Sequence, residues 1–91
     1  MALDKDTAVK NARRDLAKRL GVKENEIKDG AIETADFPDM ALGAPEAGEM
    51  SGQMIASGWR IRLNAGGKDY EYRADRNQVR LYNYKGKNYR V

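Results

Sequence analysis

Cysteine and histidine are both absent from this 91-residue chain, which excludes most of the common catalytic and metal-binding chemistries. Without a thiol there is no disulfide, no thiolate nucleophile and no cysteine-ligated zinc. Without an imidazole the chain lacks the usual general base at neutral pH and the commonest ligand of transition metals. We therefore predict that the protein is not an enzyme and carries no metal or cofactor.

Long apolar runs are also missing, because no stretch approaches the roughly 18 to 20 residues that span a bilayer. The amino-terminal residues lack the basic-then-apolar layout of a signal peptide. We expect a soluble domain without membrane insertion, cytoplasmic as written, or secreted or periplasmic if a signal segment has been removed. We also expect a monomer or weak dimer.

A large excess of one charge sign is also missing. The net charge is only +3, which by itself is too small to indicate nucleic-acid binding. The distribution is uneven. Residues 1–45 carry 8 basic and 9 acidic side chains, whereas residues 46–91 carry 9 and 5.

What is present begins with an amphipathic helix. Apolar side chains recur at spacings of three and four and so share one helical face: Val9, Ala12, Leu16 and Leu20. Asp4 or Asp6 is placed to cap the first turn, and Gly21 stands where a left-handed residue ends a helix. The pattern predicts a helix from about residue 5 to 20.

Extended segments with a period of two follow the helix. The first, Ala31 to Phe37, alternates imperfectly, because Ile32, Ala35 and Phe37 cannot share a face without an extra residue. We expect an edge strand with a bulge there, ended by Pro38, which has no N–H to donate. Residues 59–63, 70–73 and 79–84 predict a meander, and residues 88–91 a short strand or a frayed end.

These elements predict a single α+β domain over residues 1–91. One amino-terminal helix packs on one face of a three- to four-stranded antiparallel sheet, in the order α-β-β-β, with a long loop after the first strand. We expect Leu16, Leu20, Ile61 and Leu63 to be buried between helix and sheet. Trp59 shares their alternation and should cover the mouth of that core.

The long loop, residues 38–57, is rich in Gly, Ala and Met and has no periodicity. Loops of this length are usually functional or disordered. Two interpretations remain open: a binding loop on a rigid sheet, or a connection whose Met and Leu cover the core. The binding interpretation names Leu42, Gly43, Pro45, Met50, Gln53, Met54 and Gly58. Residues 42–52 should be its mobile part.

A rival hypothesis is a sheet face that binds single-stranded nucleic acid. By alternation, six basic and aromatic side chains share the face opposite the helix: Arg60, Arg62, Arg73, Arg80, Tyr82 and Tyr84. Such a mixture on an open sheet is typical of single-strand binders. Glu71 should lie among them, and no RNP-type motif occurs, so we place this hypothesis second.

Carboxylates could in principle supply acid–base pairs or a calcium site, and four lie near the loop: Asp36, Asp39, Glu46 and Glu49. Their spacing matches no EF-hand. A domain of this size offers little enclosed space to raise a carboxyl pKa. We therefore predict neither catalysis nor a bound cation.

Several stretches together resemble a known family: LAKRLGV before the loop, FPDMALGAPEAG within it, QMIASGWRIRL after it, and the GGKDYEYRAD hairpin. They are similar to small bacterial domains of the PepSY type, which are associated with peptidase propeptides. The resemblance covers roughly residues 5–82 and implies an α-β-β-β module that binds or restrains a peptidase. Gln53 to Gly58 is more weakly similar to the QxVxG hairpin of cystatins, with one residue too many.

The sequence therefore favours a noncatalytic protein- or peptide-binding module, with peptidase inhibition as one form of that activity. Single-stranded nucleic-acid binding is the alternative. The partner is not specified by any motif.

Overall fold

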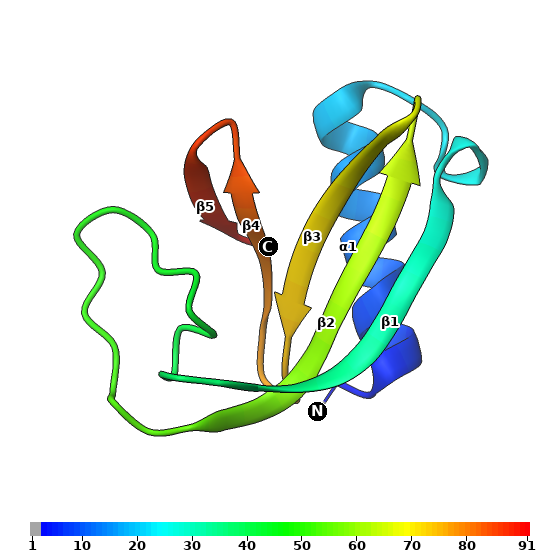
Figure 1. Ribbon diagram of the computed structural model, residues 1–91. Helices are drawn as coiled ribbons and strands as arrows, with labels where there is room; N and C mark the ends of the chain where they lie inside the picture. The colour runs from blue at the N-terminus through cyan, green and yellow to red at the C-terminus, as the bar shows by residue number, and fades with distance from the viewer. Residues whose placement is uncertain (1–2) are drawn as a thin grey trace.

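The computed structural model describes residues 3–91 as one helix and a five-stranded antiparallel sheet (Figure 1). The elements are α1 (Lys5–Leu20), a 3-10 turn η1 (Glu24–Glu26), β1 (Lys28–Phe37), β2 (Ala56–Ala65), β3 (Lys68–Ala74), β4 (Val79–Tyr84) and β5 (Lys87–Arg90). The strands lie in the sheet in their sequence order. The α+β class with an antiparallel sheet is confirmed, whereas the predicted count of three to four strands is wrong.

The additional strand arises from a tight hairpin at the carboxyl-terminal end. Lys85 and Gly86 both have positive φ, 52° and 82°, as a two-residue type I′ turn requires. β5 therefore pairs with β4, and the N–H of Val91 donates to the carbonyl of Val79 at 2.9 Å. These bonds explain why the end of the chain is not frayed.

Helix α1 has the predicted bounds because both of its caps form. The Asp4 carboxylate accepts the N–H of Thr7 at 2.7 Å, and Gly21 adopts the left-handed conformation with φ 68°. The helix has 16 residues, and no helix within residues 3–91 is long and apolar enough to cross a membrane.

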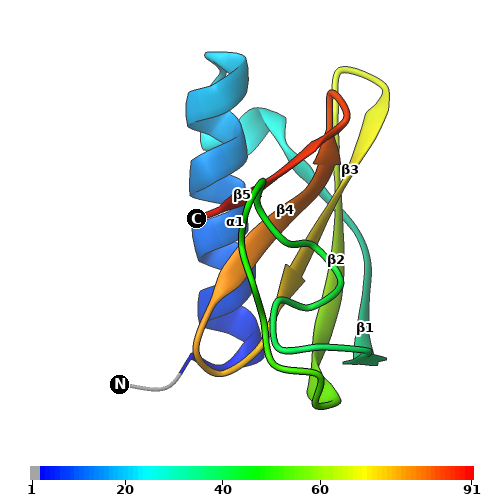
Figure 2. The same cartoon turned by 90° about the vertical axis from the view of Figure 1, so that its left-hand side faces the viewer.

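The main core lies between α1 and one face of the sheet (Figure 2). Leu16, Ile61 and Leu63 are completely buried there, as predicted, whereas Leu20 is half-buried. Trp59 is also half-buried and packs against this core. Tyr72 is buried as well, and its hydroxyl donates to the Asp15 carboxylate of α1 at 2.8 Å.

The edge strand β1 carries a bulge, but not where the alternation placed it. The register shifts between Asp29 and Ile32, ahead of the irregular alternation. Ile32 packs on the core under α1, whereas Ala35 and Phe37 belong to a second apolar cluster with Leu42 and Ala56. The alternation is imperfect because apolar side chains of β1 lie on both faces of the strand. The second face is buried because the loop that follows β1 covers it.

Candidate functional site

The long connection between β1 and β2, residues 38–55, is the 38–55 loop. Its ends are held together, because Phe37 lies opposite Ala56 in the β1–β2 register. In Figure 1 the loop is green and lies beside the β4–β5 hairpin, away from α1. Its contacts are to side chains of β3 and β4 on the face of the sheet opposite α1.

Arg80 of β4 is the main residue that attaches this loop to the sheet. Its side chain is nearly buried, and its two terminal nitrogens donate to the two oxygens of Glu49 at 2.5 and 2.7 Å. One of these nitrogens also donates to the carbonyl of Ala44 at 3.3 Å. The hydrogen bond from Arg80, helped by the N–H of Glu46, lowers the pKa of Glu49 to about 2. Glu49 is therefore ionised at neutral pH, and this bidentate pair joins the loop to β4.

Arg73 of β3 is the second residue that attaches this loop to the sheet. One terminal nitrogen donates to the carbonyls of Leu42 and Gly43, at 3.0 and 3.2 Å. Its guanidinium carbon lies 3.7 Å from the ring centre of Tyr82, within the range of a cation–π contact. The sheet thus supplies donors to loop carbonyls that face it.

Side-chain amides and turns hold further points of the loop backbone. Gln78 donates to the carbonyl of Met40 at 2.7 Å, and Asn88 to that of Pro45 at 2.9 Å. Within the loop, the Asp39 carboxylate accepts the N–H groups of Ala41 and Gly43, and the N–H of Met40 donates to the carbonyl of Gly52. The loop backbone is thus bonded at several points along its length. That residues 42–52 are the more mobile part stays a prediction.

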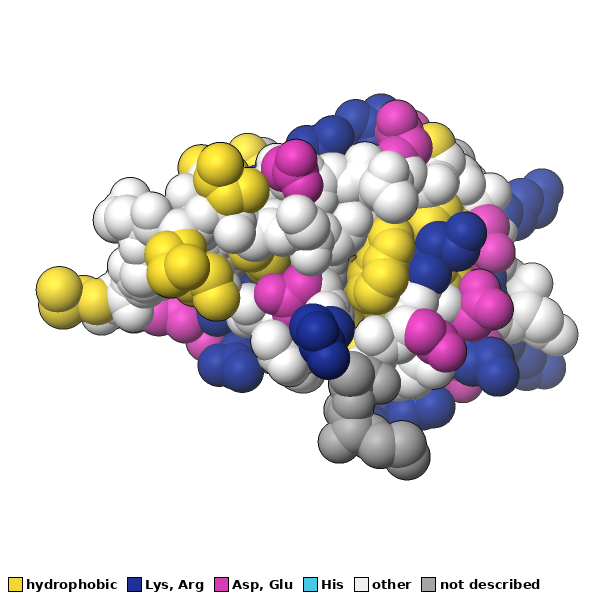
Figure 3. Space-filling model, turned by 90° about the horizontal axis from the view of Figure 1, so that it is seen from below, with side chains coloured by type: hydrophobic (Ala, Val, Ile, Leu, Met, Phe, Trp, Pro, Cys, Tyr) yellow, Lys and Arg dark blue, Asp and Glu magenta, His cyan; other side chains and the backbone are white. Residues whose placement is uncertain are grey.

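The loop has an inner and an outer side. Ala41, Leu42 and Ala44 have no exposed surface, and Leu42 packs with Phe37. Hydrophobic side chains on the outer side point into solvent, and the largest exposures are 96% for Met50, 74% for Ile55 and 69% for Met54. Figure 3 shows hydrophobic side chains standing out on the side of the molecule that carries the loop. Of the two interpretations of the loop, binding or covering the core, the second thus applies to Leu42.

The other predicted binding residues have different surroundings. Gln53 and Pro45 are exposed, and Gly43 has φ 65° and offers its carbonyl to Arg73. The structure requires glycine at position 58 for packing, because a Cβ built on it would lie 2.0 Å from the carbonyl oxygen of Ala74.

The six residues of the nucleic-acid hypothesis are not a single open face. Tyr84 packs on the α1 side of the sheet, against Tyr70 and Tyr89. Its predicted place beside Tyr82 is wrong, because Asn83 adopts φ 51° and interrupts the alternation of β4.

The arginines on the other face are largely engaged with a carboxylate. Glu71 lies 2.8 Å from Arg73, 3.5 Å from Arg60 and 3.8 Å from Arg62. Arg73 and Arg80 are directed at the loop as well. Of the predicted basic residues, Arg73 and Arg80 contact the 38–55 loop, whereas Arg60 and Arg62 pair with Glu71.

Three of the four carboxylates near the loop accept hydrogen bonds, and the exposed Glu46 carboxylate does not. Asp36 accepts from the hydroxyl of Ser57, Asp39 caps the loop turn, and Glu49 binds Arg80. Within residues 3–91, no three acidic side chains gather closely enough to hold a metal ion.

Sequence reasoning missed the roles of Ile55, Gln78 and Asn88. Ile55 lies next to Met54 in a loop without periodicity, so no pattern indicated that its side chain is exposed. The amides of Gln78 and Asn88 act on carbonyls about 40 residues earlier, and no local pattern indicates such contacts.

A family model described as a domain of unknown function (DUF8738) matches residues 9–82. This range extends from the first half of α1 into β4 and contains the whole 38–55 loop. No curated protein and no solved structure matches the chain. The chain therefore belongs to the DUF8738 family.

Proposed function

We propose that the protein is a noncatalytic binding domain that recognises another protein through the outer side of the 38–55 loop. The observation that supports this most is the exposure of Met50, Met54 and Ile55, three large apolar side chains within six residues. Large exposed apolar surface often marks an interaction site, and these three side chains lie close together in the sequence. Methionine suits such a role, because its flexible thioether adapts to irregular partner surfaces.

The attachment of the loop to the sheet gives this proposal further physical support. Ordering a loop on binding costs conformational entropy, and a loop that is already held in place avoids much of this cost. From the sheet side, Arg73 binds the carbonyls of Leu42 and Gly43, and Arg80 binds the carbonyl of Ala44 and the carboxylate of Glu49. The outer side chains of the loop stay available. The loop is thus attached to the sheet at positions close in sequence to Met50.

The nucleic-acid alternative has less support. Glu71 lies among three of its four arginines, and the fourth, Arg80, is nearly buried against Glu49. A single strand needs accessible cations along its backbone and stacked aromatic rings. The proposal is independent of the resemblance to PepSY domains, which stays a prediction, as does peptidase inhibition.

The test uses a photo-crosslinking amino acid placed at Met54 in the full chain and, as a control, at Val22. Partners that are captured only from position 54 are then purified, and their affinity for the unmodified chain is measured by calorimetry. The variant Met50→Ser/Met54→Ser/Ile55→Ser should lose most of this affinity, because apolar anchors dominate interface energetics. Val22→Ser/Val91→Ser, which removes two exposed valines elsewhere, should keep it.

Two results would overturn the proposal. One is equal affinity of the triple variant and the control variant for the purified partner. The other is submicromolar binding of an oligonucleotide at physiological salt with a steep salt dependence, which is the signature of phosphate contacts.

A further inference from the structure

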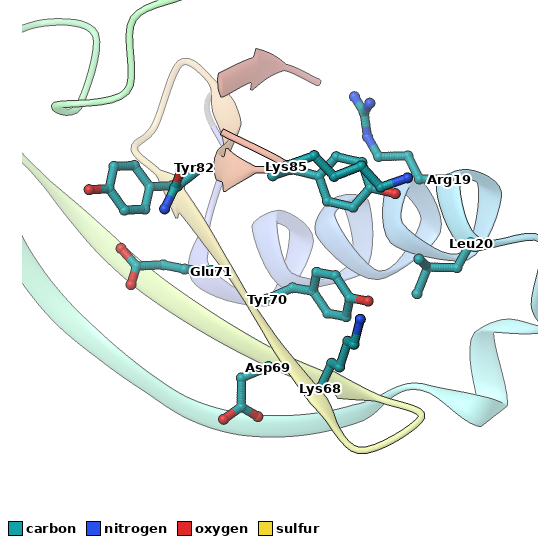
Figure 4. A pocket seen from close by; sticks show the side chains of 10 residues that line it. Arg19, Leu20, Lys68, Asp69, Tyr70, Glu71, Tyr82 and Lys85 are labelled. Carbon is teal, nitrogen blue, oxygen red and sulfur yellow. The ribbon is translucent and has the colours of Figure 1, made fainter. Parts of the chain in front are cut away.

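The sheet opens between β3 and β4 at the end away from the 38–55 loop. The two strands pair only from Glu71↔Tyr82 to Ala74↔Val79, so Lys68, Asp69 and Tyr70 have no partner in β4. β4 turns away there because Asn83 adopts a left-handed conformation. The opening, which we name the β3–β4 cleft, has a volume of about 700 Å³ and is shown in Figure 4.

The backbone groups of one residue of β3 are directed into this cleft. The hairpin between β2 and β3 is closed by a two-residue turn, Gly66 and Gly67, so Ala65 and Lys68 form its first hydrogen-bonded pair. Backbone groups of an antiparallel strand alternate between its two neighbours. Lys68 and Tyr70 therefore bond to β2, and the N–H and C=O of Asp69 point to the side where β4 is missing.

Cationic and hydroxyl groups gather on the α1 side of the cleft. Lys68 and Tyr70 extend from β3, and Tyr84 and Lys85 from the end of β4, with Leu20 of α1 beside them (Figure 4). The ring centres of Tyr70 and Tyr84 are 6.1 Å apart, and the Lys85 ammonium lies 5.4 Å from the Tyr84 ring centre. Neither lysine has an ion-pair partner within residues 3–91.

The acidic side chains that line the cleft belong to its other side. Asp69 and Glu71 alternate with Lys68 and Tyr70 along β3 and so point to the opposite face of the sheet. Asp69 accepts from Asn64 at 3.0 Å, and Glu71 accepts from Arg73 at 2.8 Å. The α1 side of the cleft is thus positively charged and also carries two tyrosine rings.

We propose that the β3–β4 cleft binds an acidic peptide segment in an extended conformation. Its backbone pairs with the N–H and C=O of Asp69, and its carboxylates lie between Lys68 and Lys85. This inference goes beyond the proposed function, because it names a second surface, separate from the 38–55 loop, and the chemistry of the segment that it binds. Strand addition supplies the backbone bonds of such complexes, and side-chain complementarity supplies their specificity.

The probe is a six-residue acetylated and amidated peptide that alternates Glu and Thr, titrated into the isotopically labelled full chain. Amide chemical shifts should change at residues 68–71 and 83–85. The same peptide with Gln in place of Glu should bind about tenfold more weakly at low salt, because it lacks the carboxylates. Binding of the Glu peptide should weaken as salt screens the exposed charges.

Lys68→Glu/Lys85→Glu should lower the affinity for the Glu peptide by at least about tenfold. Lys5→Glu/Lys10→Glu, on the exposed surface of α1, makes the same change of net charge and should leave the affinity unchanged. If the charge reversal impairs folding, Lys68→Ser/Lys85→Ser replaces it in the affinity measurement, and a thermal melt checks that this variant is folded.

Several outcomes overturn the inference. Shifts confined to the 38–55 loop would reject the cleft and leave the proposed function standing. Equal effects of the two charge-reversal variants would show nonspecific attraction. Shifts at the cleft with inorganic phosphate as large as those with the peptide would show a small-anion site. Absence of binding by the Glu peptide rejects the cleft, whereas failure of the Met54 crosslinking test rejects the loop.

Discussion

At the scale of single residues, Gly58 shows how closely two strands approach. A Cβ there would lie 2.0 Å from the carbonyl oxygen of Ala74 and 3.0 Å from the Cα of Asp75, both backbone atoms that cannot rotate away. We expect Gly58→Ala to lower the free energy of unfolding by about 2 kcal/mol or more, measured by urea denaturation. Gly52→Ala is the matched control, because its new Cβ meets only the flexible side chain of Met40 and should cost under about 0.5 kcal/mol. Similar losses for the two would mean that the strands separate easily at Gly58.

Leu42 and Met50 separate the two sides of the loop. Leu42 is fully buried, so Leu42→Ala should lower the free energy of unfolding by about 2 to 4 kcal/mol through a cavity. Met50 is 96% exposed, and Met50→Ala should change it by less than about 0.5 kcal/mol. Chemical denaturation of the two variants checks this. A loss for Met50→Ala as large as that for Leu42→Ala would contradict the inner and outer assignment.

At the scale of elements, the ion pair between Glu49 and Arg80 makes the attachment of the loop to β4 depend on pH. The hydrogen bond from Arg80 lowers the pKa of Glu49 from 4.5 to about 2 in the folded protein. The stabilisation is therefore complete above about pH 4.5 and is lost as the pH falls towards 2. Urea denaturation between these pH values should show a decline in stability that is smaller in Glu49→Gln.

The control for that experiment is Glu46→Gln, which removes a nearby exposed carboxylate and keeps the ion pair. This variant should retain the decline of the unmodified protein. If Glu49→Gln and Glu46→Gln decline equally, the loop is not held by an ionised Glu49.

At the scale of the whole molecule, one hydrogen bond joins the helix to the centre of the sheet. The Tyr72 hydroxyl donates to Asp15 at 2.8 Å, and the Arg19 Nε donates to the same carboxylate oxygen at 2.7 Å. Burial and this bond to Asp15 raise the pKa of Tyr72. Tyr72→Phe should therefore lower the free energy of unfolding by about 1.5 kcal/mol, measured by thermal or urea denaturation.

Tyr82→Phe is the control, because the Tyr82 hydroxyl makes no side-chain hydrogen bond within residues 3–91 and Tyr82 is half-buried. Its stability should change by less than about 0.5 kcal/mol. If Tyr72→Phe is equally harmless, this hydrogen bond does not contribute to holding α1 on the sheet. In that case Asp15→Asn should also be neutral.

The sequence alone determined the features that depend on neighbouring residues. The stripe from Val9 to Leu20, with Asp4 and Gly21 at its ends, specified α1, because helical periodicity and caps act within a few residues. The alternation of Ile61 and Leu63 specified their burial, because side chains of a strand point to opposite faces in turn. Asn83 was missed, since a single left-handed residue reverses this alternation without any change in composition.

Only the tertiary structure decided which side of the 38–55 loop is buried and what the arginines of the sheet do. Arg73 and Arg80 bind carbonyls about 30 to 36 residues earlier in the chain, and Leu42 meets Phe37 only after the loop has folded back. The loop has no periodicity because its conformation is set by these distant partners and not by its own neighbours. The same reason applies to the β3–β4 cleft, which exists where two strands stop pairing and which brings Lys68 and Lys85 to one side of the sheet.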